Sequence, residues 1–163
     1  LMAFLNEKCD TFRLPDGTLS PFAGRLPALD ALAARFYHAA DNARSTIVDE
    51  VQAFIANLRK NADAYSANKE TAAQYYVRVM DRAQRDGIAY IQRESDRVGK
   101  ILKKHADGIS QLTGEKLDEL QRKANVLTAF MNDRIYKAAE QARTSLAAES
   151  PEASATAGAH DEL

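Results

Sequence analysis

The chain has 163 residues and a formal net charge of −1, from 22 Lys and Arg against 23 Asp and Glu. This length suits one domain, or one domain with tails. Balanced charge argues against a protein that binds nucleic acid mainly through phosphate contacts. No apolar run approaches the roughly 20 residues of a membrane-spanning helix. Much of the 45% apolar content is alanine, which favours a modest helical core over a β-protein.

The composition gives little support to metal or redox chemistry. The single cysteine, Cys9, excludes a disulfide, a Cys-x-x-Cys redox pair and a cysteine-built zinc site within these 163 residues. Three histidines, His38, His105 and His160, are far apart and lack the spacing of a helical zinc motif. We therefore expect no catalytic residue, no metal ligand and no cofactor in this part of the protein.

Residues 10–25 have the composition of a linker. Pro15, Asp16 and Gly17 form a turn signal, because proline presets φ and glycine accepts the positive φ that follows. Further turn formers, Pro21 and Gly24, follow before the first periodic apolar segment. We place a domain boundary near residue 25.

Five amphipathic helices are predicted after this linker, each with apolar residues at i, i+3 and i+4. Pro27 suits a first helical turn, while Ser66 and Thr113 are good N-caps. The first expected helix begins near Pro27, and the second spans roughly 42–64. The third runs from Ser66–Asn68 to Arg85, the fourth covers about 88–104, and the fifth extends from Thr113 to Met131. Their short connections predict an all-α fold, a compact five-helix bundle.

The last part of the chain is predicted to be a flexible, disordered tail. From Ala138 the apolar pattern decays into Ala, Ser, Glu and Thr, interrupted by Pro151 and Gly158. A segment with so few apolar anchors cannot offset its ordering entropy. The tail ends in His160, Asp161, Glu162 and Leu163. These four residues are the retrieval signal of the endoplasmic reticulum, so we expect luminal residence and binding to the HDEL receptor.

The first residues do not resemble the signal peptide that a luminal protein needs. Leu1–Leu5 is a short apolar run that leads directly into polar residues. Two explanations stay open: a signal peptide was cleaved just before Leu1, or the chain is a C-terminal fragment. We favour the fragment, because Leu1, Met2 and Leu5 have the spacing of the last turns of a helix. Cys9 follows, and is interpreted either as a reactive thiol or as a small buried hydrophobe.

Three stretches of the sequence carry a resemblance to a known family. They are Leu26–Leu32 (LPALDAL), Tyr75–Met80 (YYVRVM) and Lys116–Phe130 (KLDELQRKANVLTAF). The region resembles the C-terminal helical domain of endoplasmic reticulum protein 29 (Windbeutel), which also follows thioredoxin-fold domains in certain protein disulfide isomerases. Phe4–Cys9 looks like the end of a last thioredoxin-domain helix, which favours the isomerase branch. The resemblance implies a five-helix fold, luminal residence and a role in protein folding and secretion.

The expected organisation has four parts. They are the end of a thioredoxin-fold domain (1–9), a linker (10–25), the helical C-terminal domain (26–137) and the tail with its retrieval signal (138–163). The expected function is a non-catalytic module of an endoplasmic reticulum protein disulfide isomerase. The upstream thioredoxin domains of the full-length parent, itself expected to be the isomerase, would carry thiol–disulfide exchange.

The expected partners are unfolded or partly folded secretory proteins, or other luminal chaperones. Neither nucleic acid nor a membrane span is expected, and the oligomeric state stays open. The alternative is a dimerisation or spacer domain without a client site. An enzymatic activity of this chain itself would need a nucleophile–base pair or a metal constellation, and the sequence offers neither at a recognised spacing.

Two pairs of side chains are the candidate client-binding residues. Tyr75 and Tyr76 point about 100° apart on a helix, so we expect one in the core and the other at its edge or outside. An exposed tyrosine is a suitable anchor for a client. Val126 and Phe130 are i, i+4 neighbours. They border an exposed apolar patch if the adjacent pair, at 127 and 131, points inward; alternatively, all four belong to the core.

Overall fold

The structure is a computed structural model, and it describes residue 6, residues 12–61 and residues 66–148. This part of the chain forms six helices: α2 (Pro27–His38), α3 (Asp41–Lys60), α4 (Ala67–Asp86), α5 (Ala89–Ala106), α6 (Gly114–Phe130) and α7 (Asp133–Ala148). Within these ranges there is no strand, and the backbone pairs in β fashion only at an isolated bridge between Arg13 and Leu19. The all-α prediction is confirmed.

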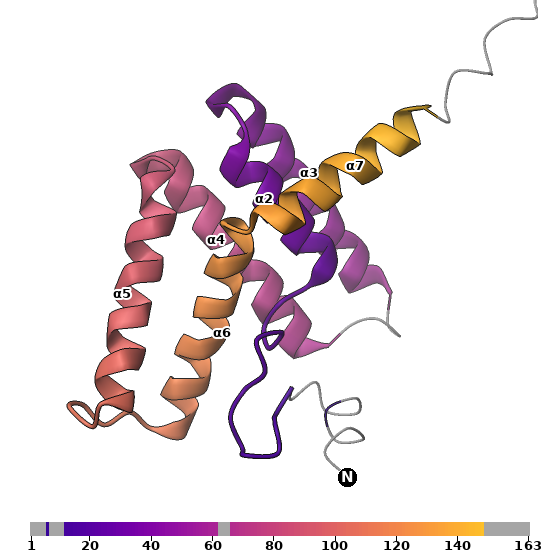
Figure 1. Ribbon diagram of the computed structural model, residues 1–163. Coiled ribbons are helices and arrows are strands. Elements are labelled where there is room, and N and C mark those ends of the chain that lie inside the picture. Colours follow the sequence, from indigo (N-terminus) through magenta and orange to yellow (C-terminus); the bar gives the residue numbers. More distant parts are fainter. Residues whose placement is uncertain (1–5, 7–11, 62–65, 149–163) are drawn as a thin grey trace, which may run out of the picture.

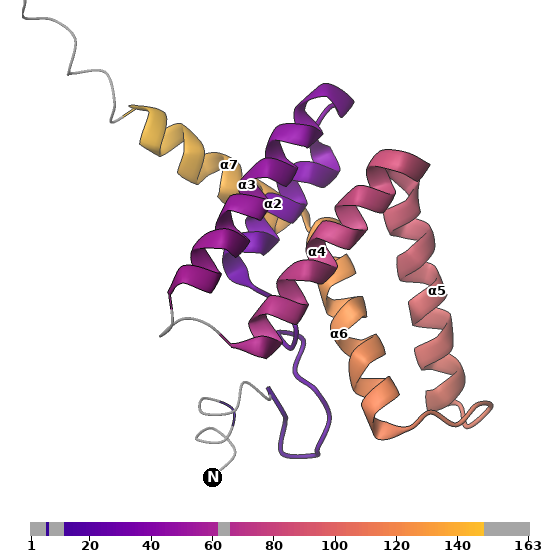
Figure 2. The ribbon, with the colours of Figure 1, turned by 180° about the vertical axis from the view of Figure 1, so that it is seen from behind.

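Helix α2 is the central element, because it packs against α3, α4, α6 and α7. Helix α5 packs against α4 and α6, and lies on the opposite side of the molecule from α3 in both views (Figures 1 and 2). The C-terminal half of α7 projects away from the other helices (Figure 1). None of the helices in the described ranges is long and apolar enough to cross a membrane.

The core lies where α2, α4 and α6 meet. Phe36, Tyr76 and Phe130 come from these three helices and are completely buried. The Phe130 ring meets Phe36 edge to face at 6.3 Å and the tilted Tyr76 ring at 6.0 Å, between ring centroids. Aromatic pairs at such distances add to the stabilisation from burying their apolar area. The apolar stripes predicted from the sequence therefore converge on one core.

The predicted helix ends agree with the structure at both polar N-caps. The hydroxyl of Ser66 accepts a hydrogen bond from the backbone N–H of Lys69, and that of Thr113 accepts one from the N–H of Lys116. Each cap satisfies a backbone donor that the helix itself leaves unpaired. Helix α3 ends at Lys60, earlier than the predicted boundary at 64, and residues 62–65 lie outside the described residues.

A sixth helix, α7, begins near the end of the predicted helical domain and continues into the predicted tail. The predicted helical domain ends at residue 137, whereas α7 continues to Ala148. Alanine has weak hydrophobic patterning but the strongest helix propensity, so the decay of the apolar pattern did not mark the end of the helix. Residues 149–163 lie outside the described residues, and with them the retrieval signal at His160–Leu163.

Contacts at its N-terminal half hold α7 against α2. The Tyr136 ring stacks on His38 at 4.2 Å between centroids, and His38 also lies 3.4 Å from a carboxylate oxygen of Asp133. The Asn132 side chain caps the helix by accepting hydrogen bonds from the N–H groups of Arg134 and Ile135. These contacts order a helix that composition alone assigned to a tail.

Residues 12–26, which we call the strap, pack on α6. The buried side-chain amide of Asn125 in α6 donates hydrogen bonds to the backbone carbonyls of Ser20, at 3.1 Å, and Ala23, at 3.0 Å. Leu19 and Ala23 of the strap are buried. The described part of the predicted linker 10–25 is therefore bound to the helical domain and is not a free connection. The turn signals in the sequence are local, and they could not reveal contacts with a residue about 100 positions later. Residues 1–5 and 7–11, including Cys9, lie outside the described residues.

One glycine shows how closely the strap approaches α6. Gly24 has a positive φ of 76°, which favours glycine. A Cβ atom built there would lie 2.7 Å from Cβ of Arg122. Any other residue at position 24 would therefore push the strap away from α6.

Candidate functional site

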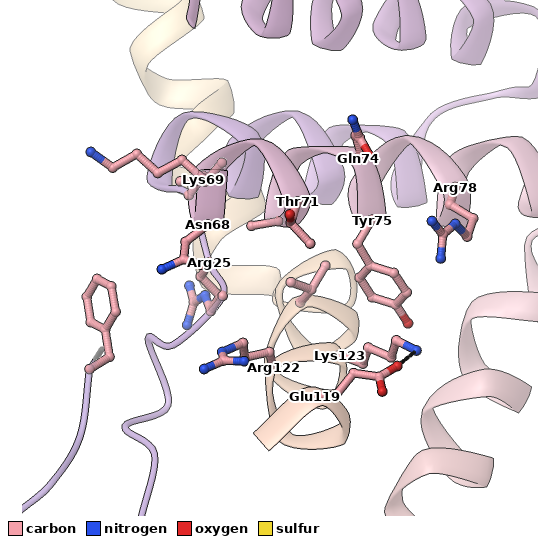
Figure 3. Close-up of a pocket in the computed structure, with 15 residues that line it drawn as sticks. Arg25, Asn68, Lys69, Thr71, Gln74, Tyr75, Arg78, Glu119, Arg122 and Lys123 are labelled. Carbon is pink, nitrogen blue, oxygen red and sulfur yellow. Dashed lines mark hydrogen bonds and ion pairs between the residues drawn. The ribbon is translucent and has the colours of Figure 1, made fainter. Parts of the chain in front are cut away.

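A groove lies between α4 and α6, with the strap as its third wall. It has a volume of about 330 Å³. Figure 3 shows Tyr75 pointing from α4 toward Lys123 and Glu119 on α6, with Arg122 beside them. Phe12 and Leu26 line the groove from the strap, and Val126 lines it from α6. Three segments that are distant in sequence therefore form one concave surface.

Tyr75 is the central side chain of this groove. Its hydroxyl oxygen is buried and has no hydrogen-bond partner within the described residues. Burial, and secondarily the negative charge of Glu94, raises the pKa of Tyr75 above its usual range, so the phenol keeps its proton at neutral pH. The ring centroid lies 5.7 Å from Nζ of Lys123, within the range of a cation–π contact. A buried, unpartnered hydroxyl costs about 1–3 kcal/mol, and a shift of the ring that let this hydroxyl donate a hydrogen bond to a ligand oxygen would relieve that cost.

The groove is rich in cationic hydrogen-bond donors. The lining includes the cationic side chains Arg25, Lys69, Arg78, Arg122 and Lys123. Glu119 is the acidic residue among the lining side chains. It forms ion pairs with Lys116, at 2.8 Å, and with Lys123. Hydrogen bonds from these two lysines lower the pKa of Glu119 to about 2, so it stays ionised.

Arg25 and Arg122 are partly neutralised by acids just outside the lining of the groove. Arg25 lies 2.8 Å from a carboxylate oxygen of Asp30, and Arg122 lies 3.9 Å from one of Asp118. A modest positive excess remains around the groove. The surface therefore suits a ligand with many oxygen acceptors, including carboxylates.

The neighbouring tyrosine, Tyr76, belongs to the core. Its hydroxyl donates to a carboxylate oxygen of the buried Asp30 at 2.5 Å and accepts from the N–H of Leu26 at 3.2 Å. The Arg25 guanidinium completes the shell of Asp30. Burial, and then the Asp30 charge, raises the pKa of Tyr76. The two tyrosines divide between core and edge as their 100° separation predicts.

The structure has no exposed apolar patch at Val126 and Phe130. Both side chains are buried, as is Leu127 between them. The reason is that α6 packs against α2 and α5 and also carries the strap, so both flanks of the helix are covered. Of the two alternatives, the exposed patch is therefore excluded, and Phe130 and Tyr76 have no surface to offer a client. Of the four candidate residues, Tyr75 and Val126 line the groove.

Sequence reasoning missed the polar residues of the groove. On α6, Arg122 and Lys123 lie three and four residues after Glu119, and Val126 lies four and three residues after them, so these residues share one helix face. That spacing was a readable signal, but periodicity does not tell which helix a face will meet. Among the described residues, no group of three His, Cys, Asp or Glu side chains is placed to hold a metal ion.

The sequence matches one protein family over residues 24–130, described as "Endoplasmic reticulum protein ERp29, C-terminal domain". This range begins in the strap, at Gly24, and ends with α6. Helix α7 therefore lies beyond the family match.

Curated relatives extend the similarity to longer proteins. Protein disulfide-isomerase erp38 of Neurospora crassa is 35% identical over 146 residues, which are 90% of this chain and 35% of that protein. Protein disulfide isomerase-like 2-2 of Oryza sativa is 31% identical, over 78% of this chain and 31% of that protein. Protein disulfide-isomerase 1 of Dictyostelium discoideum is 28% identical over the same shares. The chain thus spans about a third of the length of these relatives.

No solved structure is a significant match to this chain. The family match covers most of the helices that build the core and the groove, and the most similar of the three relatives described above is a protein disulfide isomerase. This chain belongs to the family of endoplasmic reticulum protein ERp29 C-terminal domains.

Proposed function

We propose that this chain is a non-catalytic binding module of a protein disulfide isomerase in the lumen of the endoplasmic reticulum. Its groove between α4 and α6 binds extended segments of incompletely folded secretory proteins. Thioredoxin-fold domains elsewhere in the full-length protein carry out thiol–disulfide exchange. The observation that supports this proposal most directly is a groove rich in cationic donors and lined by Tyr75, whose buried hydroxyl has no partner among the described residues.

The chemistry of the groove suits the backbone of an extended segment. Each residue of such a segment offers a carbonyl oxygen, which matches the donors of Tyr75, Arg122 and Lys123. The half-buried Leu26, with the buried Val126 beneath the groove, provides apolar surface for a side chain of the client. A volume of about 330 Å³ is at the lower end of ligand pockets, so it accommodates one or two side chains and not a folded domain. The groove therefore recognises unfolded chain with little dependence on sequence.

Charge adds a preference among such segments. The positive excess around the groove favours clients with carboxylates near the bound residue, and disfavours lysine-rich ones. Ionic screening weakens interactions between exposed charges. We therefore expect binding that falls as the salt concentration rises.

Weak binding is sufficient for the proposed role, because the module is joined to the catalytic domains. A linked site converts the second encounter into an intramolecular one, with an effective concentration of order mM. The strap forms one wall of the groove, and it is the first described segment of the domain. A client in the groove is therefore held beside the point where preceding domains join.

An NMR titration of the isotope-labelled chain with an unfolded, cysteine-free peptide tests the groove. We expect shifts that cluster at Tyr75, Lys123 and the strap. Lys123→Gln should weaken binding of an acidic peptide severalfold, because it removes a donor and a charge from the groove. Lys104→Gln is the matched control, since Lys104 is exposed on α5 and should leave binding unchanged.

Absence of shifts at millimolar peptide would refute the client-binding role. The alternative, a dimerisation or spacer domain without a client site, predicts that result together with a concentration-dependent dimer in sedimentation. Equal losses of affinity in Lys123→Gln and Lys104→Gln would instead mean nonspecific charge attraction, and would also contradict a specific groove.

The luminal location depends on the retrieval signal at 160–163 and on the family. A secretion assay tests it: the chain is directed into the secretory pathway with a cleavable signal peptide, and its release into the medium is measured. Removal of the four residues should cause secretion, whereas the intact chain should stay in the cell. Equal secretion of both forms would contradict a retrieval role.

A further inference from the structure

We infer that the strap is an interdomain docking surface, and that its exposed Leu14 and Phe22 contact the domain that precedes this one in the longer proteins of the family. In that arrangement the strap sets a fixed orientation between the two domains and is not a flexible tether. The inference does not depend on what the groove binds.

A small hairpin gives the first half of the strap a fixed shape. The N–H of Leu14 donates to the carbonyl of Thr18, and that of Ser20 donates to the carbonyl of Phe12, each at 2.8 Å. The Arg13 guanidinium spans the turn to the carbonyl of Gly17 at 2.8 Å. A tether that only joins two domains needs none of these bonds.

Three further contacts fix this hairpin to its surroundings. Arg13 also pairs with the half-buried Asp118 of α6. Upstream of the strap, the Asn6 side chain makes two hydrogen bonds of 2.8 Å with the backbone N–H and carbonyl of Arg13. The chain is therefore tied down at the end from which preceding residues arrive.

The second half of the strap is anchored to the core of the bundle. Asn125 is a buried residue whose side-chain NH2 group donates both of its hydrogen bonds to strap carbonyls, those of Ser20 and Ala23. Arg25 is bound to the buried Asp30. Undocking the strap would leave the Asn125 amide and the Asp30 carboxylate short of partners inside the protein, which is costly. The strap is thus held by the same polar groups that complete the core.

This anchored segment presents large apolar side chains to solvent. Among the described residues, four large apolar side chains are exposed, and two of them, Leu14 (39%) and Phe22 (63%), lie on the strap. The guanidinium carbon of Arg25 lies 5.5 Å from the Phe22 ring centroid, so the ring has a partner that positions it. A single exposed apolar residue is ordinary; two on one short, immobilised segment indicate a surface that another protein part covers.

The family identifies that part as the preceding domain. The family is described as a C-terminal domain, so in its members polypeptide precedes the position of Gly24. About two-thirds of each relative lies outside the matched region. The strap is the segment through which this polypeptide enters, so a preceding domain lies next to it by connectivity alone. Covalent linkage lets a small apolar contact hold, because the effective concentration is high.

Small-angle X-ray scattering on the full-length protein that carries this domain tests the inference. The double variant Leu14→Ser/Phe22→Ser should increase the maximum dimension and broaden the distance distribution, since the domains separate. Ile109→Ser is the control, because Ile109 is 72% exposed at the α5–α6 turn, away from the strap. This substitution should change neither the maximum dimension nor the distance distribution. All three side chains are exposed, so thermal unfolding of the helical domain should stay the same and show that the variants fold.

A second variant tests the same surface by weakening the attachment of the strap to α6. Asn125→Leu keeps the approximate volume but removes both hydrogen bonds to the strap. It should accelerate hydrogen exchange at the amides of Leu14, Ser20 and Ala23, and should expand the full-length protein as the double variant does.

Two results would overturn the inference. Unchanged scattering in Leu14→Ser/Phe22→Ser would mean that the domains already move independently. A dimer of the 163-residue chain that Phe22→Ser dissociates in sedimentation would mean that a second copy, and not the preceding domain, covers this surface. Loss of client binding has no bearing on either result, so failure of the proposed function and failure of the docking surface are distinguishable.

Discussion

Two neighbouring tyrosines of α4 lie in two regions that differ in how they accommodate a buried hydroxyl. The hydroxyls of Tyr75 and Tyr76 are both removed from water. In the core seam, where α2, α4 and α6 meet, the Tyr76 hydroxyl has Asp30 and Leu26 as partners. In the groove, the Tyr75 hydroxyl has none among the described residues. A buried polar group with all its hydrogen bonds made helps to specify a unique core. A buried polar group without a partner marks a place where a ligand can supply the missing hydrogen bond.

The acidic residues of the two regions also differ, in how far they are buried. Asp30 is buried and enclosed by Arg25 and Tyr76. Glu119 is 43% exposed at its side chain, so water screens its pairs with Lys116 and Lys123. Buried pairs are costly to break from one side, while exposed pairs contribute little. Substitutions should therefore affect folding in the seam and affect binding in the groove.

The largest effect is expected at Phe130, the aromatic centre of the seam. Phe130→Ala removes a completely buried ring that contacts Phe36 and Tyr76. Loss of a buried phenylalanine costs about 3–5 kcal/mol. Chemical denaturation should show a drop of this size in the free energy of unfolding. A loss below about 1 kcal/mol would contradict the position of Phe130 at the core.

Tyr76→Phe tests the polar half of the seam. It leaves the ring in place but removes one partner of the buried Asp30 and the acceptor of the Leu26 N–H. We expect a loss of about 1–3 kcal/mol in the free energy of unfolding. The matched control is the same substitution one residue earlier, in the groove.

Tyr75→Phe should leave the stability nearly unchanged and reduce the affinity for a client. Its hydroxyl has no partner to lose, so we expect a change in the free energy of unfolding between zero and a gain of about 1 kcal/mol. Client affinity should fall, as measured by NMR titration. If both Tyr→Phe variants destabilise the protein equally, the contrast between seam and groove is wrong.

The smallest effect concerns the pH dependence of the groove. The pKa of Glu119 is lowered to about 2 from its model-peptide value of 4.5. The ionised form therefore adds stability that is fully present above about pH 4.5 and is lost as the pH falls toward 2. Because Glu119 is partly exposed, the contribution should be under about 1 kcal/mol. Unfolding at pH 6 and pH 3 should show Glu119→Gln less stable at pH 6, and the difference narrowing at pH 3. A difference that does not narrow would exclude the lysine pairs as its cause.

The helical order was readable from the sequence because it depends on local periodicity. The apolar spacing at i, i+3 and i+4, and the caps at Ser66 and Thr113, each depend on residues within a turn or two of one helix. The same local signals failed at α7. There, the low hydrophobicity of alanine hid a helix that docks through Tyr136 against His38.

The candidate site was only partly predictable. The angle between Tyr75 and Tyr76 follows from helix geometry, and predicted correctly that they divide between core and edge. The sequence left open whether Val126 and Phe130 form a patch or belong to the core, because the patch required one flank of α6 to be uncovered. Whether a flank is covered depends on the packing of α2, α5 and the strap, which no pattern within α6 encodes.

The sequence by itself determined the all-α class, the family and the approximate helix positions, because each follows from short-range spacing or from residue identity. Tertiary structure alone decided that α7 is docked, that residues 12–26 are bound to α6 through Asn125, and that Tyr75 faces a groove while Tyr76 completes the core. The physical reason is separation along the chain: Asn125 meets Ser20 and Ala23 across about 100 residues. Such contacts depend on how helices pack, and helix packing is a property of the whole molecule.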